Sequence, residues 1–251
     1  MANVRKVAVM IGSLRRESFT RKIANTLIEL APPTLAPEIV EIGGVSFYNQ
    51  DLEPSPPSDW IALRDKLRSA DAVLFATPEY NRSVPGVLKN AIDVASRPKE
   101  TNVFNGKPGA VISVSTGAIS GFGANHHLRQ MLVFLNVLTM QQPEAYIGGV
   151  TKLLDESGRV TNESTRDFLK QFMEAFAKWI ERVGGLSQKK GSGSRHSLFH
   201  QTGPDQVQVM TPLVISQVFA VCVWVAVALH DGGGPATAVT TTVTFCEGLK
   251  P

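Results

Sequence analysis

The first 186 residues of this 251-residue chain contain no cysteine, because Cys222 and Cys246 both lie in the remainder. This absence excludes disulfide scaffolds, thiolate zinc sites and cysteine nucleophiles from the larger part of the chain. The same part holds two histidines, His126 and His127, which are adjacent and would point apart on a helix. We therefore expect no metal site.

The chain also has neither a large excess of one charge nor a long basic run. The 25 Lys and Arg residues against 22 Asp and Glu leave a formal net charge of +3, and no nucleic-acid-binding patch is apparent. An apolar fraction of 43% excludes an intrinsically disordered chain. Residues Met1–Lys6 lead straight into a strand-like run, so we expect no signal peptide and a cytoplasmic protein.

The composition changes near residue 186, which predicts a domain over 1–186 and a separate extension over 187–251. The extension carries only seven charged residues, and a Gly-Ser linker stands at 191–194. Its uncharged run of 17 residues, Leu213–Leu229, allows a marginal membrane anchor, while its valines and threonines suit β-strands better. We favour a poorly ordered extension foreign to the domain, with membrane contact only if this run anchors the protein.

Within 1–186, apolar runs that suit strands buried on both faces alternate with helical spacing. We expect strands at 6–11, 38–42, 72–76, 110–114 and from 137 to 140, and helices at 23–30, 58–67, 84–95, 125–136 and 168–183. Ser58 is the expected N-cap of the second helix, and Gly184-Gly185 the expected end of the last. Five strands alternating with helices predict a doubly wound parallel α/β sheet.

Ligands of such sheets bind at the carboxyl ends of the strands, where three loops stand: Gly12–Ser18, Thr77–Ser83 and Ser115–Gly123. The first places glycine and hydroxyl residues around Arg15 at the start of a helix, which indicates a phosphate site. The alternative is a capped turn with solvated arginines. No Walker A sequence or nucleophile elbow is present, and His126 replaces the third glycine of a dinucleotide fingerprint.

The second loop is stiffened by proline and glycine and offers Tyr80 as a flat apolar surface. A planar heterocycle attached to the phosphate fits this surface. Tyr80 as a core aromatic is the alternative, and Glu79 and Asn81 can equally cap or brace the loop. For His126 and His127, surface positions on a helix are the favoured interpretation.

Three motifs closely resemble the NAD(P)H-dependent FMN reductases, with bacterial quinone and chromate reductases as the nearest members. They are GSLRRESF at 12–19, TPEYN-x-SVPG-x-LKNAID at 77–93 and HLRQMLVFL at 127–135. The resemblance covers residues 5–185. It implies a flavodoxin-like three-layer α/β/α fold with a five-stranded parallel sheet of order 2-1-3-4-5.

The resemblance also implies a role for each loop. The phosphate of FMN would be held by the first, and the two sides of the isoalloxazine ring would be lined by the other two. The residues implied for the phosphate are Ser13, Arg15, Ser18 and Thr20. Those implied for one side of the ring are Pro78, Glu79, Tyr80 and Asn81, and those for the other side are Ser115, Thr116 and Gly117. Glu17 and Thr20 depart from the family pattern, which has glycine and asparagine there, and so do Gly123 and His126 near the expected tetramer contact.

The implied activity is hydride transfer from NADH or NADPH to tightly but non-covalently bound FMN, and then by ping-pong to quinones and incidentally to chromate. The cofactor supplies the chemistry, so no catalytic side chain is required. The resemblance further implies a homodimer or homotetramer. An electron carrier without a substrate of its own is the alternative, and the slightly basic charge favours the enzyme because such carriers are usually strongly acidic.

Overall fold

The computed structural model describes residues 4–192 of the chain. The predictions made for Leu213–Leu229, the two cysteines and the rest of 193–251 lie outside these residues and stay predictions. Among the helices between residues 4 and 192, none is both long and apolar enough to cross a bilayer.

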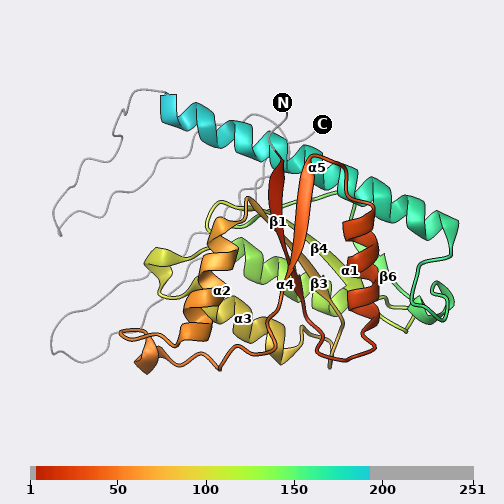
Figure 1. Ribbon diagram of the computed structural model, residues 1–251, viewed down its shortest axis with the longest axis horizontal. Helices are drawn as coiled ribbons and strands as arrows, with labels where there is room; N and C mark the ends of the chain where they lie inside the picture. The colour runs from red at the N-terminus through yellow and green to blue at the C-terminus, as the bar shows by residue number, and fades with distance from the viewer. Residues whose placement is uncertain (1–3, 193–251) are drawn as a thin grey trace, which may run out of the picture. The chain divides into compact units, whose positions relative to one another are not determined.

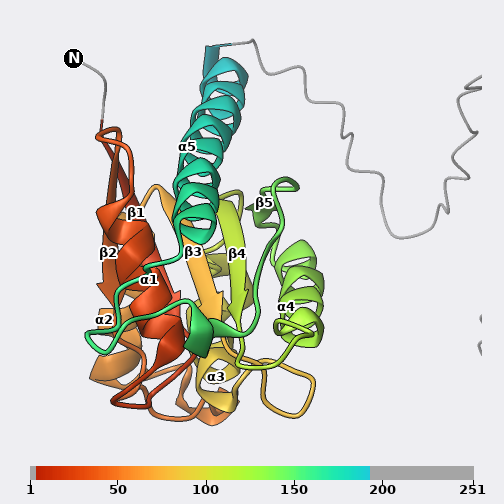
Figure 2. The ribbon, with the colours of Figure 1, turned by 90° about the vertical axis from the view of Figure 1, so that its right-hand side faces the viewer.

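The centre of the described part is a parallel sheet of order β2-β1-β3-β4-β5, with β6 also paired to β4 (Figures 1 and 2). The predicted strand order is therefore confirmed. Val9 of β1 pairs with Ile39 of β2 on one side and Leu74 of β3 on the other. The strands are β1 (Arg5–Ile11), β2 (Leu35–Val40), β3 (Ala72–Thr77), β4 (Pro108–Val114), β5 (Leu138–Thr139) and β6 (Ala145–Ile147).

Helices cover both faces of the sheet, which explains why its strands are apolar at consecutive positions. Val7 and Val9 belong to the core shared with α1 and α5, whereas Ala8 and Met10 belong to the core shared with α2, α3 and α4. The helices are α1 (Phe19–Glu29), α2 (Ser58–Ser69), α3 (Gly86–Ser96), α4 (Phe122–Phe134) and α5 (Glu163–Ser192). The predicted three-layer α/β/α architecture is confirmed.

The two helix ends for which the sequence offered a specific capping signal are both wrong. Ser58 is the first residue of α2, and Pro57 occupies the N-cap position without a side-chain hydrogen bond. The last helix continues through Gly184-Gly185 to Ser192 and includes the first two residues of the predicted linker. Glycine costs only about 1 kcal/mol in a helix interior, and Gly184 does not adopt the positive φ with which glycine ends helices.

The predicted fifth strand is split in two. β5 ends at Thr139 and β6 begins at Ala145, and both pair with β4. Pro143 lies in the interruption and has no backbone N–H to donate to a neighbouring strand.

Candidate functional site

A cavity of about 140 Å³ lies where the loops after β1, β3 and β4 meet at the carboxyl edge of the sheet. Eleven residues line it, and eight of them are residues that the sequence predicted for the site. The eight are Ser13, Arg15, Thr20, Pro78, Glu79, Tyr80, Ser115 and Thr116. The parallel sheet thus brings together three loops that lie far apart in the sequence.

The loop after β1 presents hydrogen-bond donors at the start of α1. Ser18 is the N-cap and is buried, and its Oγ accepts a hydrogen bond from the backbone N–H of Arg21 at 3.1 Å. Ser18 therefore shapes the turn and does not line the cavity. The backbone N–H groups of Phe19 and Thr20 and the hydroxyls of Ser13 and Thr20 have no hydrogen-bond partner within residues 4–192.

The charges on this loop are arranged so that no carboxylate competes with these donors. The Glu17 carboxylate pairs with Lys22 Nζ at 2.7 Å, and this hydrogen bond lowers the pKa of Glu17. Arg15 is exposed, with its guanidinium carbon 5.6 Å from the centre of the Phe19 ring. The negative charge of Glu17, where the family pattern has glycine, is thus balanced by Lys22.

The loop after β3 is a tight hairpin with Tyr80 at the cavity. Tyr80 and Ser83 exchange two backbone hydrogen bonds of 3.0 Å, and Asn81 stands at the tip with a φ of 52°. Tyr80 is 46% exposed, so the alternative of a core aromatic is wrong. Asn81 does not line the cavity, and the Glu79 carboxylate accepts a hydrogen bond from the backbone N–H of Ala124.

The loop after β4 adds a polar wall. Ser115 Oγ accepts a hydrogen bond from the backbone N–H of Gly117 at 3.1 Å, and the N–H of Ser115 donates to Ile147 at 2.8 Å. The backbone N–H groups of Thr116 here and of Glu79 across the cavity have no partner in the described part of the chain. Gly117 supports this turn without lining the cavity.

Three lining residues were missed by sequence reasoning: Phe19, Val114 and Val150. Val150 is fully buried and its N–H donates to the carbonyl of Ser115 at 3.2 Å. In the sequence, the pair Gly148-Gly149 marks this segment. The structure shows why glycine stands there, because a Cβ on Gly148 would collide with Ser120 Oγ. The predicted surface positions of His126 and His127 are confirmed, since both are exposed.

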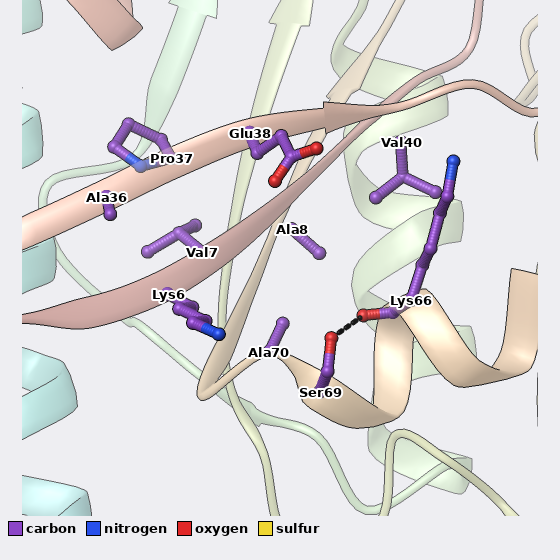
Figure 3. Close-up of a pocket in the computed structure, with 10 residues that line it drawn as sticks. All are labelled: Lys6, Val7, Ala8, Ala36, Pro37, Glu38, Val40, Lys66, Ser69 and Ala70. Atoms are coloured by element: carbon purple, nitrogen blue, oxygen red, sulfur yellow. Dashed lines mark hydrogen bonds between the residues drawn. The ribbon is translucent and has the colours of Figure 1, made fainter.

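A larger cavity of about 460 Å³ lies elsewhere, between β1, β2 and the end of α2 (Figure 3). Its charged lining residues are Lys6, Glu38 and Lys66, and Ser69 Oγ donates to the Lys66 carbonyl at 2.8 Å. This cavity faces the C-terminal turn of a helix, which does not attract an anion. The cavity between the loops is therefore the candidate site.

The donor set of the candidate site fits a phosphate group. Residues that line the cavity supply free N–H groups at the start of α1, two unpartnered hydroxyls and an arginine, and the nearby Glu17 carboxylate is paired with Lys22. A helix N-terminus and charge-assisted hydrogen bonds favour a phosphate at such a place. Fold and site together define an α/β protein whose cavity at the carboxyl edge of the sheet suits a phosphorylated ligand.

The comparisons with known proteins identify the family. Residues 5–152 match the family model of the NADPH-dependent FMN reductases. A quinone reductase from Pseudomonas putida is 57% identical over 182 residues, which cover 72% of this chain and 97% of the relative. The chain belongs to the NADPH-dependent FMN reductase family, which consists of oxidoreductases that use FMN and NAD(P)H.

Two further relatives agree with this assignment. A 2-hydroxy-1,4-benzoquinone reductase from a Burkholderia species is 45% identical over 175 residues, which cover 70% of this chain and 96% of the relative. The solved structure of FerB, a flavoenzyme NAD(P)H:(acceptor) oxidoreductase from Paracoccus denitrificans, matches at a TM-score of 0.68 with 43% identity. The match covers 72% of this chain and 99% of that one. The predicted family, enzyme class and cofactors are confirmed, whereas the residue roles stay predictions.

Proposed function

We propose that this protein is an FMN-dependent NAD(P)H oxidoreductase that reduces quinones and, incidentally, chromate. The observation that carries the proposal is the set of unpartnered donors at the start of α1, which opens toward Tyr80 and Thr116. Relatives named quinone reductase at 57% and 38% identity support the acceptor class. The division into a reductase domain over 1–186 and a separate extension is part of the same proposal.

The loop after β1 would hold the FMN phosphate. The N–H groups of Phe19 and Thr20 and the hydroxyls of Ser13 and Thr20 would donate to its oxygens, and Arg15 would supply a balancing charge. Ser18 would act through the turn that it caps. At about 140 Å³ the cavity is smaller than the ~300–1,000 Å³ of pockets that enclose a whole ligand, so it would enclose only part of FMN.

The loops after β3 and β4 would flank the ring. Tyr80 offers an exposed aromatic surface, and the unpartnered N–H groups of Glu79 and Thr116 would donate to electronegative ring atoms. Asn81 and Gly117 would support the two turns from outside the cavity. Bound between these loops, FMN would supply the two-electron transfer from NAD(P)H to a quinone. Exposed Arg15 and Arg16 would attract an anionic acceptor such as chromate.

A turnover assay tests the proposed function. The full chain is loaded with FMN, and the oxidation of NADH and of NADPH is followed with benzoquinone and with chromate. We expect turnover that requires FMN and a quinone, with parallel double-reciprocal plots as the ping-pong order demands. A protein that takes up no FMN would contradict the proposal, and FMN uptake without turnover would favour an electron carrier.

We also propose a homodimer or homotetramer. The outer side of α4 and the loop before it expose several large apolar side chains: Ile119, Phe122, Val133 and Phe134. Apolar groups gathered in this way favour contact with another protein surface, for which a second copy is the simplest source. Analytical ultracentrifugation of the full chain at micromolar concentration measures the oligomeric state, and a monomer would contradict this proposal.

A further inference from the structure

The Tyr80–Ser83 hairpin has a backbone that needs support from its surroundings. Asn81 and Arg82 have φ values of 52° and 65°, in the left-handed region that non-glycine residues rarely adopt. A two-residue turn of this kind matches the twist of a hairpin but favours glycine or asparagine at both positions. Such conformations persist where the rest of the structure holds them in place.

The Glu79 carboxylate, only 12% exposed, supplies one such support. Its Oε2 accepts a hydrogen bond from the backbone N–H of Ala124 at 3.0 Å, in the first turn of α4. The N-cap of α4 is Gly121, which has no side chain to fill this role, so the cap comes from Glu79, 45 positions before Ala124. The positive end of the helix dipole favours a carboxylate here.

Two further contacts join the hairpin to α4. A Cβ on Gly123 would lie 2.7 Å from the carbonyl oxygen of Arg82 and 3.0 Å from Glu79 Oε2, so glycine permits the close approach. One turn further along, His127 Nδ1 lies 3.0 Å from Ser83 Oγ. Because the loop after β4 leads directly into α4, these contacts connect it to the hairpin on the other side of the cavity.

We propose that Glu79 is a positioning residue whose carboxylate holds the Tyr80–Ser83 hairpin against the start of α4. It thereby fixes the place of Tyr80 and of the Glu79 backbone N–H relative to Thr116. In this role the carboxylate does not itself contact FMN, and Glu79 lines the ring, as the family resemblance implies, through its backbone. The inference rests on the proposed function for its effect on FMN, but the hairpin–helix connection itself does not depend on it.

Five variants, one of them a matched control, test the proposal. Glu79→Ala removes the cap, Glu79→Gln keeps an acceptor oxygen, and Arg82→Gln removes only the ion pair with Glu79, whose atoms lie 3.3 Å apart. If Glu79→Ala fails to fold, Gly123→Ala separates the hairpin from α4 while the Glu79 side chain is kept, because the added Cβ crowds both the Arg82 carbonyl and the Glu79 carboxylate. Gly86→Ala is its matched control, because a Cβ there meets no atom within 4 Å.

Amide hydrogen exchange in the FMN-free protein measures directly how firmly the Tyr80–Ser83 hairpin is held against α4. We expect exchange at Ala124 and Ser83 to accelerate about tenfold in Glu79→Ala and in Gly123→Ala, because hydrogen bonds to charged groups are among the stronger ones. Glu79→Gln and Gly86→Ala should stay near wild type. Unchanged exchange at both amides in Glu79→Ala would overturn the proposal, whether or not the protein binds FMN.

FMN titration, followed by the visible flavin spectrum, then tests whether the Glu79 carboxylate positions Tyr80 and the Glu79 backbone N–H for FMN. We expect the Kd to rise about tenfold in Glu79→Ala with a shifted spectrum, and by less than about threefold in Glu79→Gln and Arg82→Gln. Wild-type affinity and spectrum in Glu79→Ala would overturn the proposal, as would a loss in Glu79→Gln equal to that in Glu79→Ala. A wild-type protein that binds no FMN would contradict the proposed function, while the exchange result would still decide the hairpin–helix connection.

Discussion

The side chain of Asn125, fully buried in α4, is the centre of a hydrogen-bond network that includes Ser113, two residues before the cavity-lining Ser115. Its amide nitrogen donates to Ser113 Oγ at 3.3 Å and to the carbonyl of Ala145 at 3.2 Å. Its oxygen accepts from Arg129 Nε at 2.9 Å. Ser113 Oγ donates in turn to the carbonyl of Ser120 at 2.8 Å. One amide therefore connects β4, β6 and the loop after β4.

Replacing Asn125 by alanine should lower the free energy of unfolding by about 2–3 kcal/mol, because buried polar partners lose their hydrogen bonds. Urea denaturation measures this loss. Asn105→Ala is the matched control: Asn105 is exposed and accepts one hydrogen bond from Asn136 at 2.8 Å, so its loss should be within about 0.5 kcal/mol. Equal losses in the free energy of unfolding would contradict the expectation that the buried hydrogen bonds of Asn125 stabilise the protein more than the exposed one of Asn105.

Residue types on the predicted loops identified most of the cavity lining, because a phosphate requires donors and these loops supply them. The exceptions have physical causes. Ser18 is used by its own turn as the N-cap, and Asn81 is used by the hairpin for its positive φ. Val114 and Val150 are apolar, and nothing in their type distinguishes a cavity wall from a core position.

Between elements, Lys107 connects the start of β4 to the end of α2. Its Nζ donates to the carbonyl of Arg68 at 3.3 Å and also to the carbonyl of Ala70. Cations at the C-terminal end of a helix satisfy its free carbonyls. Burial lowers the pKa of Lys107 below its ordinary value, which the nearby Asp71 only partly opposes.

This lowered pKa gives the stability a specific pH dependence. The unfolded chain binds the Lys107 proton more tightly than the folded protein does. The contribution of Lys107 to the free energy of unfolding therefore rises as pH rises from the folded pKa toward the ordinary lysine value of about 10.4. The difference in the free energy of unfolding between wild type and Lys107→Met, measured by urea denaturation, should increase as the pH is raised toward about 10.4. A difference that is constant or falls over this range would contradict the expectation.

Element type and order were predictable from periodicity, whereas element ends were not. The strand interruption before Ala145 and the continuation of α5 through Gly184 depend on tertiary contacts and on φ values. Glycine and proline signal where an end is permitted, and packing decides whether it occurs.

At the scale of the whole described part, the winding of the sheet creates the site. Loops that begin near residues 12, 77 and 115 meet because three adjacent parallel strands end at one edge. The two cores follow from alternate positions of the same strands, which is why consecutive apolar residues predicted the layers. The sequence pattern alone predicted this arrangement, but the family resemblance was needed to propose which ligand occupies it.

The central claim is that the start of α1 binds the phosphate of FMN. Paired fluorescence titrations with FMN and with riboflavin, which lacks the phosphate, test it most directly. We expect the wild type to bind FMN about 100-fold more tightly than riboflavin. In Arg15→Gln this ratio should fall about tenfold, with riboflavin binding unchanged. Equal affinities for FMN and riboflavin in the wild type, or no binding of either, would contradict the claim.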